Sequence, residues 1–175
     1  AGLLADGEIY GGAKGYAGEI GHMTLLADNG PLCACGRRGC FEAVCGVRAV
    51  LERAKAVIPE EAFLEHGISK GKLTITHLTS SPLAAYPEAQ KLIGETGHYI
   101  GILVANLVNL LNPETVILGG ELTTLGGSLL RAVEAEVEKR TLEEIQRTVG
   151  IQISNMRGSA PLMGAYALAL ERIFS

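Results

Sequence analysis

Three of the chain's four cysteines fall within eight residues, and this cluster constrains the fold more than any other feature. Cys33, Cys35 and Cys40 are separated by gaps of two and five residues, with Gly36 and Gly39 between them. Such a short loop can gather three sulfur atoms around one point. Cysteines two residues apart rarely reach disulfide geometry, so the spacing favours a metal site over bridges. Reduced structural thiols remain the alternative.

A fourth ligand is available eleven residues upstream of the cysteines. His22 precedes the turn-prone stretch Asp28-Asn29-Gly30-Pro31, which can return the chain to Cys33. Three cysteines and one histidine form an ordinary closed tetrahedral zinc set. The sequence therefore predicts a zinc-binding loop over residues about 22–40 with ligands His22, Cys33, Cys35 and Cys40. Cys45 follows on the apolar side of a helix, where we expect a small buried hydrophobic residue.

Two carboxylates flank the predicted zinc loop. Glu19 comes three residues before His22, and Glu42 comes two residues after Cys40. Judged singly, Glu19 is a surface acid and Glu42 a favourable charge in the first turn of a helix. If a metal draws His22 and Cys40 together, however, both carboxylates come with them. Two carboxylates and an imidazole edge would accept hydrogen bonds from vicinal hydroxyls, and His22 could serve both metal and ligand.

Charge and hydropathy exclude several classes of partner. The 175 residues are 47% hydrophobic and 19% charged, which suits one folded domain with a sizeable core. A net charge of -4 and 5% aromatic residues argue against direct contact with nucleic acid. The longest apolar run, 99–111, is too short to span a bilayer. Because the chain begins with Ala1 and has no signal-type segment, we expect it to be part of a longer protein.

Hydrophobic periodicity predicts four helices and four short strands. The helices are Phe41–Val57, Glu88–Leu111, Ser128–Arg140 and Leu162–Phe174. The strands are Gly2–Ala5 and Ile9–Gly11, paired around Asp6-Gly7, then Thr115–Leu118 as a buried central strand, and Ile151–Ser154. This order predicts an α/β fold in which flanking helices cover one mixed sheet. Residues 59–87 carry the weakest pattern, with either a strand or a helix start near Leu73–Leu78.

The glycine, cysteine and carboxylate motifs together resemble the signature of a known family. Gly18-Glu19-Ile20-Gly21-His22, followed by Cys-x-Cys-Gly-x-x-Gly-Cys-x-Glu from Cys33 to Glu42, is similar to the signature of the ROK family. That family groups bacterial sugar-responsive repressors, uncharacterised reading frames and sugar kinases. The resemblance continues through Asn109–Gly120 and Leu162–Ala169, so it covers nearly the whole chain.

The resemblance implies an actin-like ATPase (ribonuclease-H-like) fold, of which residues 1–175 would be the C-terminal lobe. An N-terminal lobe and any DNA-binding domain would then lie outside this chain. It also implies that zinc is structural and that Glu19, His22 and Glu42 contact a sugar or sugar phosphate. Gly119 and Gly120 would lie where kinase members hold the nucleotide, although a glycine pair after a strand more often makes a turn. A cytoplasmic homodimer is the implied assembly.

Within the family, the sequence favours the sugar-sensing lobe of a transcriptional regulator. Leu73–Leu78 and Glu95–Pro113 look more like regulators than kinases. The alternative is the C-terminal lobe of an ATP-dependent sugar kinase similar to glucokinase, and only then is ATP a cofactor. Kinase members use an aspartate base, whereas Asp6 falls in a hairpin turn and Asp28 in the metal-side loop, so this chain alone is not expected to be an enzyme. A zinc module without a small ligand is the third hypothesis.

Overall fold

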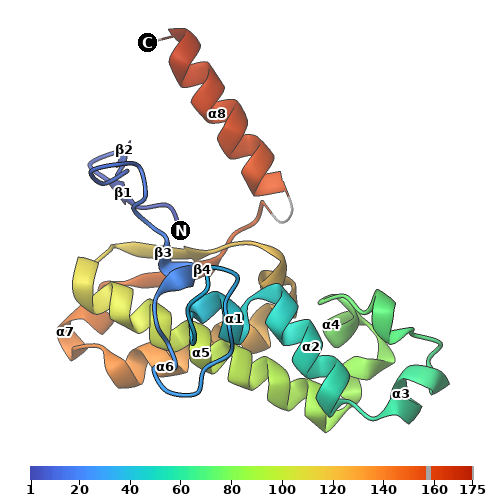
Figure 1. Cartoon of the computed structure of the whole chain (residues 1–175). Coiled ribbons are helices and arrows are strands. Elements are labelled where there is room, and N and C mark those ends of the chain that lie inside the picture. Colours follow the sequence, from blue (N-terminus) through green and yellow to red (C-terminus); the bar gives the residue numbers. More distant parts are fainter. Residues whose placement is uncertain (157–158, 175) are drawn as a thin grey trace. The chain divides into compact units, whose positions relative to one another are not determined.

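The computed structural model describes residues 1–156 and 159–174, which form two compact units, Ala1–Val50 and Leu51–Ser175 (Figure 1). The first unit opens with the predicted hairpin. Strands β1 (Leu4–Ala5) and β2 (Glu8–Ile9) pair antiparallel, with Leu4 opposite Ile9. Asp6 and Gly7 both have positive φ, 52° and 81°, as a two-residue type I′ turn requires. The hairpin prediction is confirmed.

The helix predicted over Phe41–Val57 is two helices, α1 (Phe41–Cys45) and α2 (Val47–Val57). Gly46 separates them with an extended backbone, φ -66° and ψ 165°. A Cβ atom at Gly46 would stand 2.5 Å from the carbonyl oxygen of Glu42, so this break admits only glycine. The periodicity identified the helical residues correctly but could not show the interruption.

A pair of long helices forms the centre of the second unit (Figure 1). Helices α5 (Pro87–Leu111) and α6 (Gly126–Arg140) pack side by side. They approach closely because Gly97 has no side chain, and a Cβ atom there would lie 2.4 Å from that of Ala132. Helix α5 ends at Asn112, whose left-handed φ of 44° precedes Pro113, as the sequence predicts.

A small parallel sheet covers one side of this helix pair. Strands β3 (Thr115–Leu118) and β4 (Gly150–Ile153) pair in parallel, and α6 and α7 (Glu143–Gln146) form the crossover between them. Val116, Leu118 and Ile151 pack against a core of valines and alanine on α5 and α6. The opposite face is open, and Ile117 is 62% exposed.

The prediction of a single mixed sheet is therefore wrong. The described residues contain two separate two-stranded sheets, β1–β2 and β3–β4, and the lobe is mostly helical. Strand β3 lies where predicted, but it is not buried on both faces. Hydrophobicity alone overstated its burial, because a β-branched run also suits a strand with one covered face.

Residues 58–87 are helical and supply part of the core. They contain α3 (Glu60–Glu65), the 3₁₀ turn η2 (Lys70–Lys72), α4 (His77–Ser80) and the 3₁₀ turn η3 (Pro82–Ala85). Ile75, Leu78 and Leu83 are fully buried. Of the two alternatives predicted near Leu73–Leu78, the helix start agrees with the structure and the strand does not.

The last helix is α8 (Ala160–Phe174), close to the predicted Leu162–Phe174. Most of its described apolar side chains are exposed, among them Leu162 at 74% and Phe174 at 82%. Within the described part of the chain, no helix combines the length and apolarity needed to cross a membrane.

Candidate metal centre and adjoining pocket

A short strand-like pairing brings His22 to the cysteines. Thr24 forms an antiparallel bridge with Cys40, and the Phe41 N–H donates to the Met23 carbonyl at 2.9 Å. The 3₁₀ turn η1 (Ile20–His22) immediately precedes this pairing and packs against α1. His22 therefore reaches Cys40 across the loop, although the two are 18 positions apart in the sequence.

Gly39 makes this close pairing sterically feasible. The carbonyl of Gly39 accepts hydrogen bonds from the N–H groups of Leu25 and Leu26 at 2.7 and 3.1 Å. Its φ is +71°, and a Cβ atom would stand only 1.7 Å from the Leu26 carbonyl oxygen. No side chain fits here, so this glycine is a condition for the metal loop to close.

A second, tighter turn positions the first two cysteines. Leu32 forms a bridge with Arg38, the Cys33 N–H donates to the Arg37 carbonyl at 2.8 Å, and the Gly36 N–H donates to the Cys33 carbonyl at 2.9 Å. The turn folds the Cys-x-Cys segment back toward Cys40, which opens α1 as its N-cap residue.

The ligand atoms of His22, Cys33, Cys35 and Cys40 all lie within 4.8 Å of one another. The Sγ atoms of Cys35 and Cys40 are 3.6 Å apart, and Cys33 Sγ is 3.7 Å from His22 Nδ1. A tetrahedral zinc with Zn–S bonds of about 2.3 Å places its ligand atoms about 3.8 Å apart. The cluster therefore has the size and donor set of a closed zinc site. Cys45 is fully buried outside these four residues, as predicted.

The thiols of the cluster differ in their ease of ionisation. A hydrogen bond from the Arg37 backbone lowers the pKa of Cys35 to about 6. Burial raises the pKa of Cys40 to about 11. Metal-bound cysteines are thiolates. Cys35 therefore readily supplies a thiolate to a cation, whereas Cys40 would lose its proton only when the cation binds.

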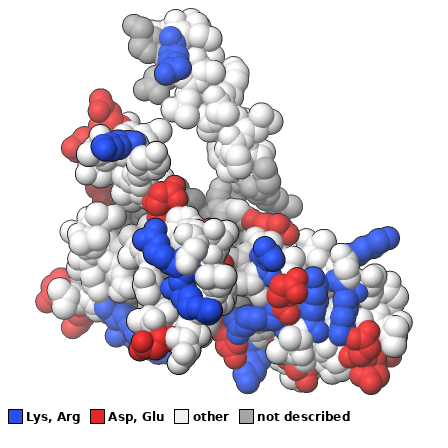
Figure 2. Space-filling model, viewed as in Figure 1, with Lys and Arg blue, Asp and Glu red and all other residues white. Residues whose placement is uncertain are grey.

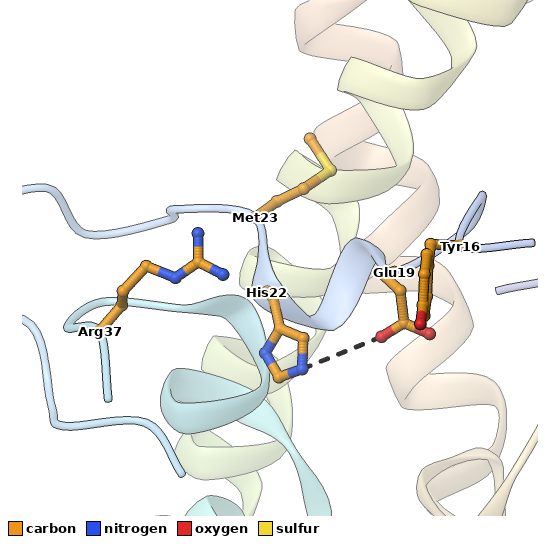
Figure 3. Close-up of a pocket in the computed structure, with 5 residues that line it drawn as sticks. All are labelled: Tyr16, Glu19, His22, Met23 and Arg37. Carbon is orange, nitrogen blue, oxygen red and sulfur yellow. Dashed lines mark ion pairs between the residues drawn. The ribbon is translucent and has the colours of Figure 1, made fainter. Parts of the chain in front are cut away.

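The other side of His22 faces an open cavity of about 620 Å³. Tyr16, Glu19, His22, Met23 and Arg37 line it. The Nε2 atom of His22 is 3.9 Å from the Glu19 carboxylate, and Figure 3 shows His22 between Glu19 on one side and Arg37 on the other. His22 thus turns Nδ1 toward the cysteines and Nε2 toward the cavity.

Glu42 lies beside the same turn. A Cβ atom at Gly21 would be 3.4 Å from Glu42 Oε2, so this carboxylate lies against the residue that precedes His22. Glu42 is nevertheless not among the side chains that line the cavity. The structure therefore brings Glu19 and His22 together at the cavity. Glu42 lies next to Gly21, outside the cavity lining.

The predicted glycine pair belongs to the second unit. Gly119 and Gly120 follow β3, and Gly120 has a φ of +91° where it caps the 3₁₀ turn η4 (Glu121–Leu125). A Cβ atom at either position would meet nothing within 4 Å. The pair makes the turn that the simpler interpretation expects, and a nucleotide role for it stays a prediction.

Three residues that line the cavity were not predicted from the sequence: Tyr16, Met23 and Arg37. Tyr16 lies in the glycine-rich segment before Glu19, and Arg37 lies inside the cysteine loop, so proximity to the motifs was an available signal. Met23 directly follows His22 and so carries the same signal. It lines the cavity because the pairing with Phe41 fixes the backbone there.

The family model described as "ROK family" matches residues 1–172. The chain belongs to the ROK family. It is 31% identical to a glucokinase of Halalkalibacterium halodurans, over 93% of this chain and 50% of that protein. It is 28% identical to the xylose repressor of Caldicellulosiruptor bescii, over 100% of this chain and 44% of that protein. This ROK chain thus spans about half the length of these two relatives.

A solved structure agrees with the fold. The crystal structure of a ROK family glucokinase from Streptomyces griseus, in complex with glucose and AMPPNP, superposes with a TM-score of 0.81 at 26% identity. The superposition covers 95% of this chain and 55% of that one. The chain is therefore a ROK lobe of the sugar kinase-like type, and its relatives include both glucokinases and repressors.

Proposed function

We propose that this ROK chain is the sugar-sensing lobe of a transcriptional regulator, ordered by a structural zinc. The observation that carries the proposal is the orientation of His22. Its Nδ1 lies 3.7 Å from Cys33 Sγ, and its Nε2 lies 3.9 Å from Glu19 in an open cavity. One side chain thus joins a metal cluster to a carboxylate-lined pocket.

The proposed zinc is held by His22, Cys33, Cys35 and Cys40. All four positions are protein ligands, so no open position remains for water and the ion would supply a cross-link, not catalysis. It would fix the tautomer of His22, because a ligand at Nδ1 leaves the hydrogen on Nε2. In this tautomer His22 would donate to a sugar oxygen through Nε2, where the sequence alone led us to expect an acceptor, while Glu19 would accept from a hydroxyl.

The carboxylates at the pocket suit a polyhydroxylated ligand. A carboxylate accepts from two hydroxyls at once, and charge-assisted bonds of this kind are stronger than neutral ones. Glu19 lines the cavity, and Glu42, whose carboxylate lies against Gly21 next to His22, would supply the second carboxylate. The sugar complex of the related Streptomyces griseus glucokinase supports this assignment.

Two observations favour a regulator. The chain is 28% identical to the Caldicellulosiruptor bescii xylose repressor over 100% of its length, and the segments Leu73–Leu78 and Glu95–Pro113 look more like regulators of the family than its kinases. On the face shown in Figure 2, acidic and basic side chains are interspersed, which suits a lobe that senses a sugar without holding DNA itself. A sugar would then act by shifting the population of arrangements that present a DNA-binding domain elsewhere in the protein.

The second candidate is the C-terminal lobe of a glucokinase-like sugar kinase. The 31% identity to the Halalkalibacterium halodurans glucokinase favours it. Gly119 and Gly120 would then contact ATP. A coupled assay with glucose, ATP and Mg²⁺ on the longer protein that carries both lobes separates the candidates. Sugar binding without phosphoryl transfer there supports the regulator, and turnover establishes the kinase.

Calorimetry with a panel of hexoses and N-acetylhexosamines tests sugar binding. We expect one sugar to bind with an affinity that Glu19→Gln and Glu42→Ala lower at least about tenfold, since each removes a charged acceptor. Glu8→Gln is the matched control, an exposed acid of the same unit outside the pocket. If no sugar binds, the zinc module without a small ligand becomes the better explanation.

Metal analysis tests the zinc. The purified protein should contain about one zinc per chain, and His22→Ala or Cys35→Ser should lower this content sharply. A metal-free protein with native circular dichroism and a cooperative unfolding transition would contradict the zinc site.

A further inference from the structure

The three sulfur atoms of the cluster are not equally accessible. Cys33 and Cys40 are 5% and 1% exposed, whereas Cys35 is an exposed residue. An oxidant in solution therefore meets Cys35 first. The fourth cysteine, Cys45, is fully buried on α1 and is shielded from the same reagent.

Cys35 also has a partner within reach. Its Sγ atom lies 3.6 Å from that of Cys40, about 1.6 Å longer than a disulfide bond. Cys33 is a poorer partner, because a bridge between residues two apart is strained. Four residues lie between Cys35 and Cys40, a loop long enough to close.

The backbone is enclosed on the Cys40 side of the pair and exposed on the Cys35 side. Cys40 follows Gly39, whose backbone is enclosed by the Leu26 carbonyl and hydrogen-bonded to Leu25. Cys35 precedes Gly36, where a Cβ atom would meet nothing within 4 Å. The approach of about 1.6 Å that a disulfide requires would therefore come from the exposed Cys35 side, where nothing packs against the turn at Gly36.

We propose that Cys35 is a site of reversible oxidation by hydroperoxides, with Cys40 as its resolving partner. The Cys35 sulfur attacks the O–O bond of ROOH, forms a sulfenic acid and releases ROH. The Cys40 sulfur then attacks the sulfenic sulfur, a disulfide forms and water leaves. In total two thiols and one ROOH give one disulfide, one ROH and one H₂O.

The disulfide would dismantle the zinc site on which the proposed function rests. Cys33 and His22 alone remain as ligands, and two ligands do not complete a tetrahedral site. His22 then keeps Cys33 as a neighbour but loses the zinc that would hold Nδ1 in place and keep Nε2 directed toward Glu19. After oxidation of the loop, the cluster would no longer hold His22 in place at the cavity. Reduction with a thiol such as dithiothreitol, together with added zinc, would restore the zinc site.

The test treats the zinc-loaded full chain with hydrogen peroxide in the presence of a chromophoric zinc chelator. We expect release of about one zinc per chain, loss of two of the four thiols, and a Cys35–Cys40 cross-link in a non-reducing peptide map. Retention of zinc and of all four thiols would overturn the proposal, as would a cross-link between other cysteines.

A matched pair of variants separates Cys35 from its neighbours. Cys35→His keeps four zinc ligands without the exposed sulfur, and we expect it to slow zinc release about tenfold or more. Cys33→His replaces a buried sulfur and keeps the reactive pair, so it should release zinc at nearly the wild-type rate. If both variants behave alike, the inference is wrong. The peptide map of the wild-type protein decides the matter where a variant fails to fold.

The zinc content before oxidation distinguishes this inference from the proposed function. A protein without zinc at the start contradicts the zinc site, and the Cys35–Cys40 cross-link is then measured in the metal-free protein. A zinc-loaded protein that resists peroxide contradicts only the redox inference.

Discussion

At the scale of single residues, the metal loop depends most on Gly39. Its positive φ and its contact with the Leu26 carbonyl leave no room for a methyl group. Cys33, Cys35 and Cys40 supply the donors, but Gly39 lets the strands that carry His22 and Cys40 meet.

Gly39→Ala should therefore lower the zinc content and destabilise the first unit. Gly36→Ala is the matched control, because Gly36 also has a positive φ, +86°, but faces open space. We expect Gly36→Ala to cost about 1 kcal/mol from backbone strain alone and Gly39→Ala clearly more. Zinc content and chemical denaturation measure both, and equal effects would contradict the steric argument.

At the scale of elements, α6 carries a buried charge that ties it to α5. Glu136 has a side chain only 10% exposed and accepts from Lys139 at 2.8 Å and Arg140 at 2.9 Å on its own helix. His98 of α5 lies 3.2 Å away. Hydrogen bonds from Lys139 and Arg140 lower the pKa of Glu136 from 4.5 to about 2, against the opposing effect of burial.

This shift predicts how stability depends on pH. Because the folded pKa is depressed, the carboxylate stabilises the protein above pH 4.5, and this contribution is lost as the pH falls toward about 2. Glu136→Gln should lower the free energy of unfolding by about 2 kcal/mol at pH 7, and the difference from wild type should narrow on acidification. Urea denaturation at pH 7 and pH 3 measures it. Glu134→Gln, an exposed acid on α6, serves as control.

A further prediction concerns the helical segment between α2 and α5. Its sequence pattern was the weakest in the chain, so its contribution to the core is worth testing. Ile75 is fully buried between η2 and α4. Ile75→Ala should lower the free energy of unfolding by about 2–5 kcal/mol through the cavity it leaves. Leu64→Ala, at a position 73% exposed, should change it by no more than about 0.5 kcal/mol. A small effect at Ile75 would show that this segment contributes little to the core.

At the scale of the whole molecule, the chain divides within α2, after the metal loop and α1. The proposed zinc ligands all belong to Ala1–Val50, whereas the α5–α6 core belongs to Leu51–Ser175. Stability that depends on the metal should therefore be confined to the first unit.

Hydrogen exchange on the full chain checks this division. Removal of zinc with a chelator should abolish amide protection in residues 19–45 and leave it within about twofold in α5 and α6, whose cores contain no ligand of the cluster. Loss of protection across both helices would show instead that the two units unfold as one.

The sequence by itself determined the local features: the hairpin at Asp6-Gly7, the end of α5 at Asn112, and the residues of the Cys₃His cluster. Each depends on residue types within a few positions or on a spacing specific to one chemistry. Only the tertiary structure decided the break at Gly46, the open face of β3, the burial of Ile75 and the entry of Tyr16, Met23 and Arg37 into the cavity. These features depend on what packs against each segment. The contacts responsible join residues that are far apart in the sequence, and a periodic pattern along the chain cannot reveal them. The Cys₃His cluster illustrates both contributions. Its four members were predicted from their spacing in the sequence. The tertiary pairing of Thr24 with Cys40 then directs one nitrogen of His22 toward the sulfur atoms and the other toward the pocket.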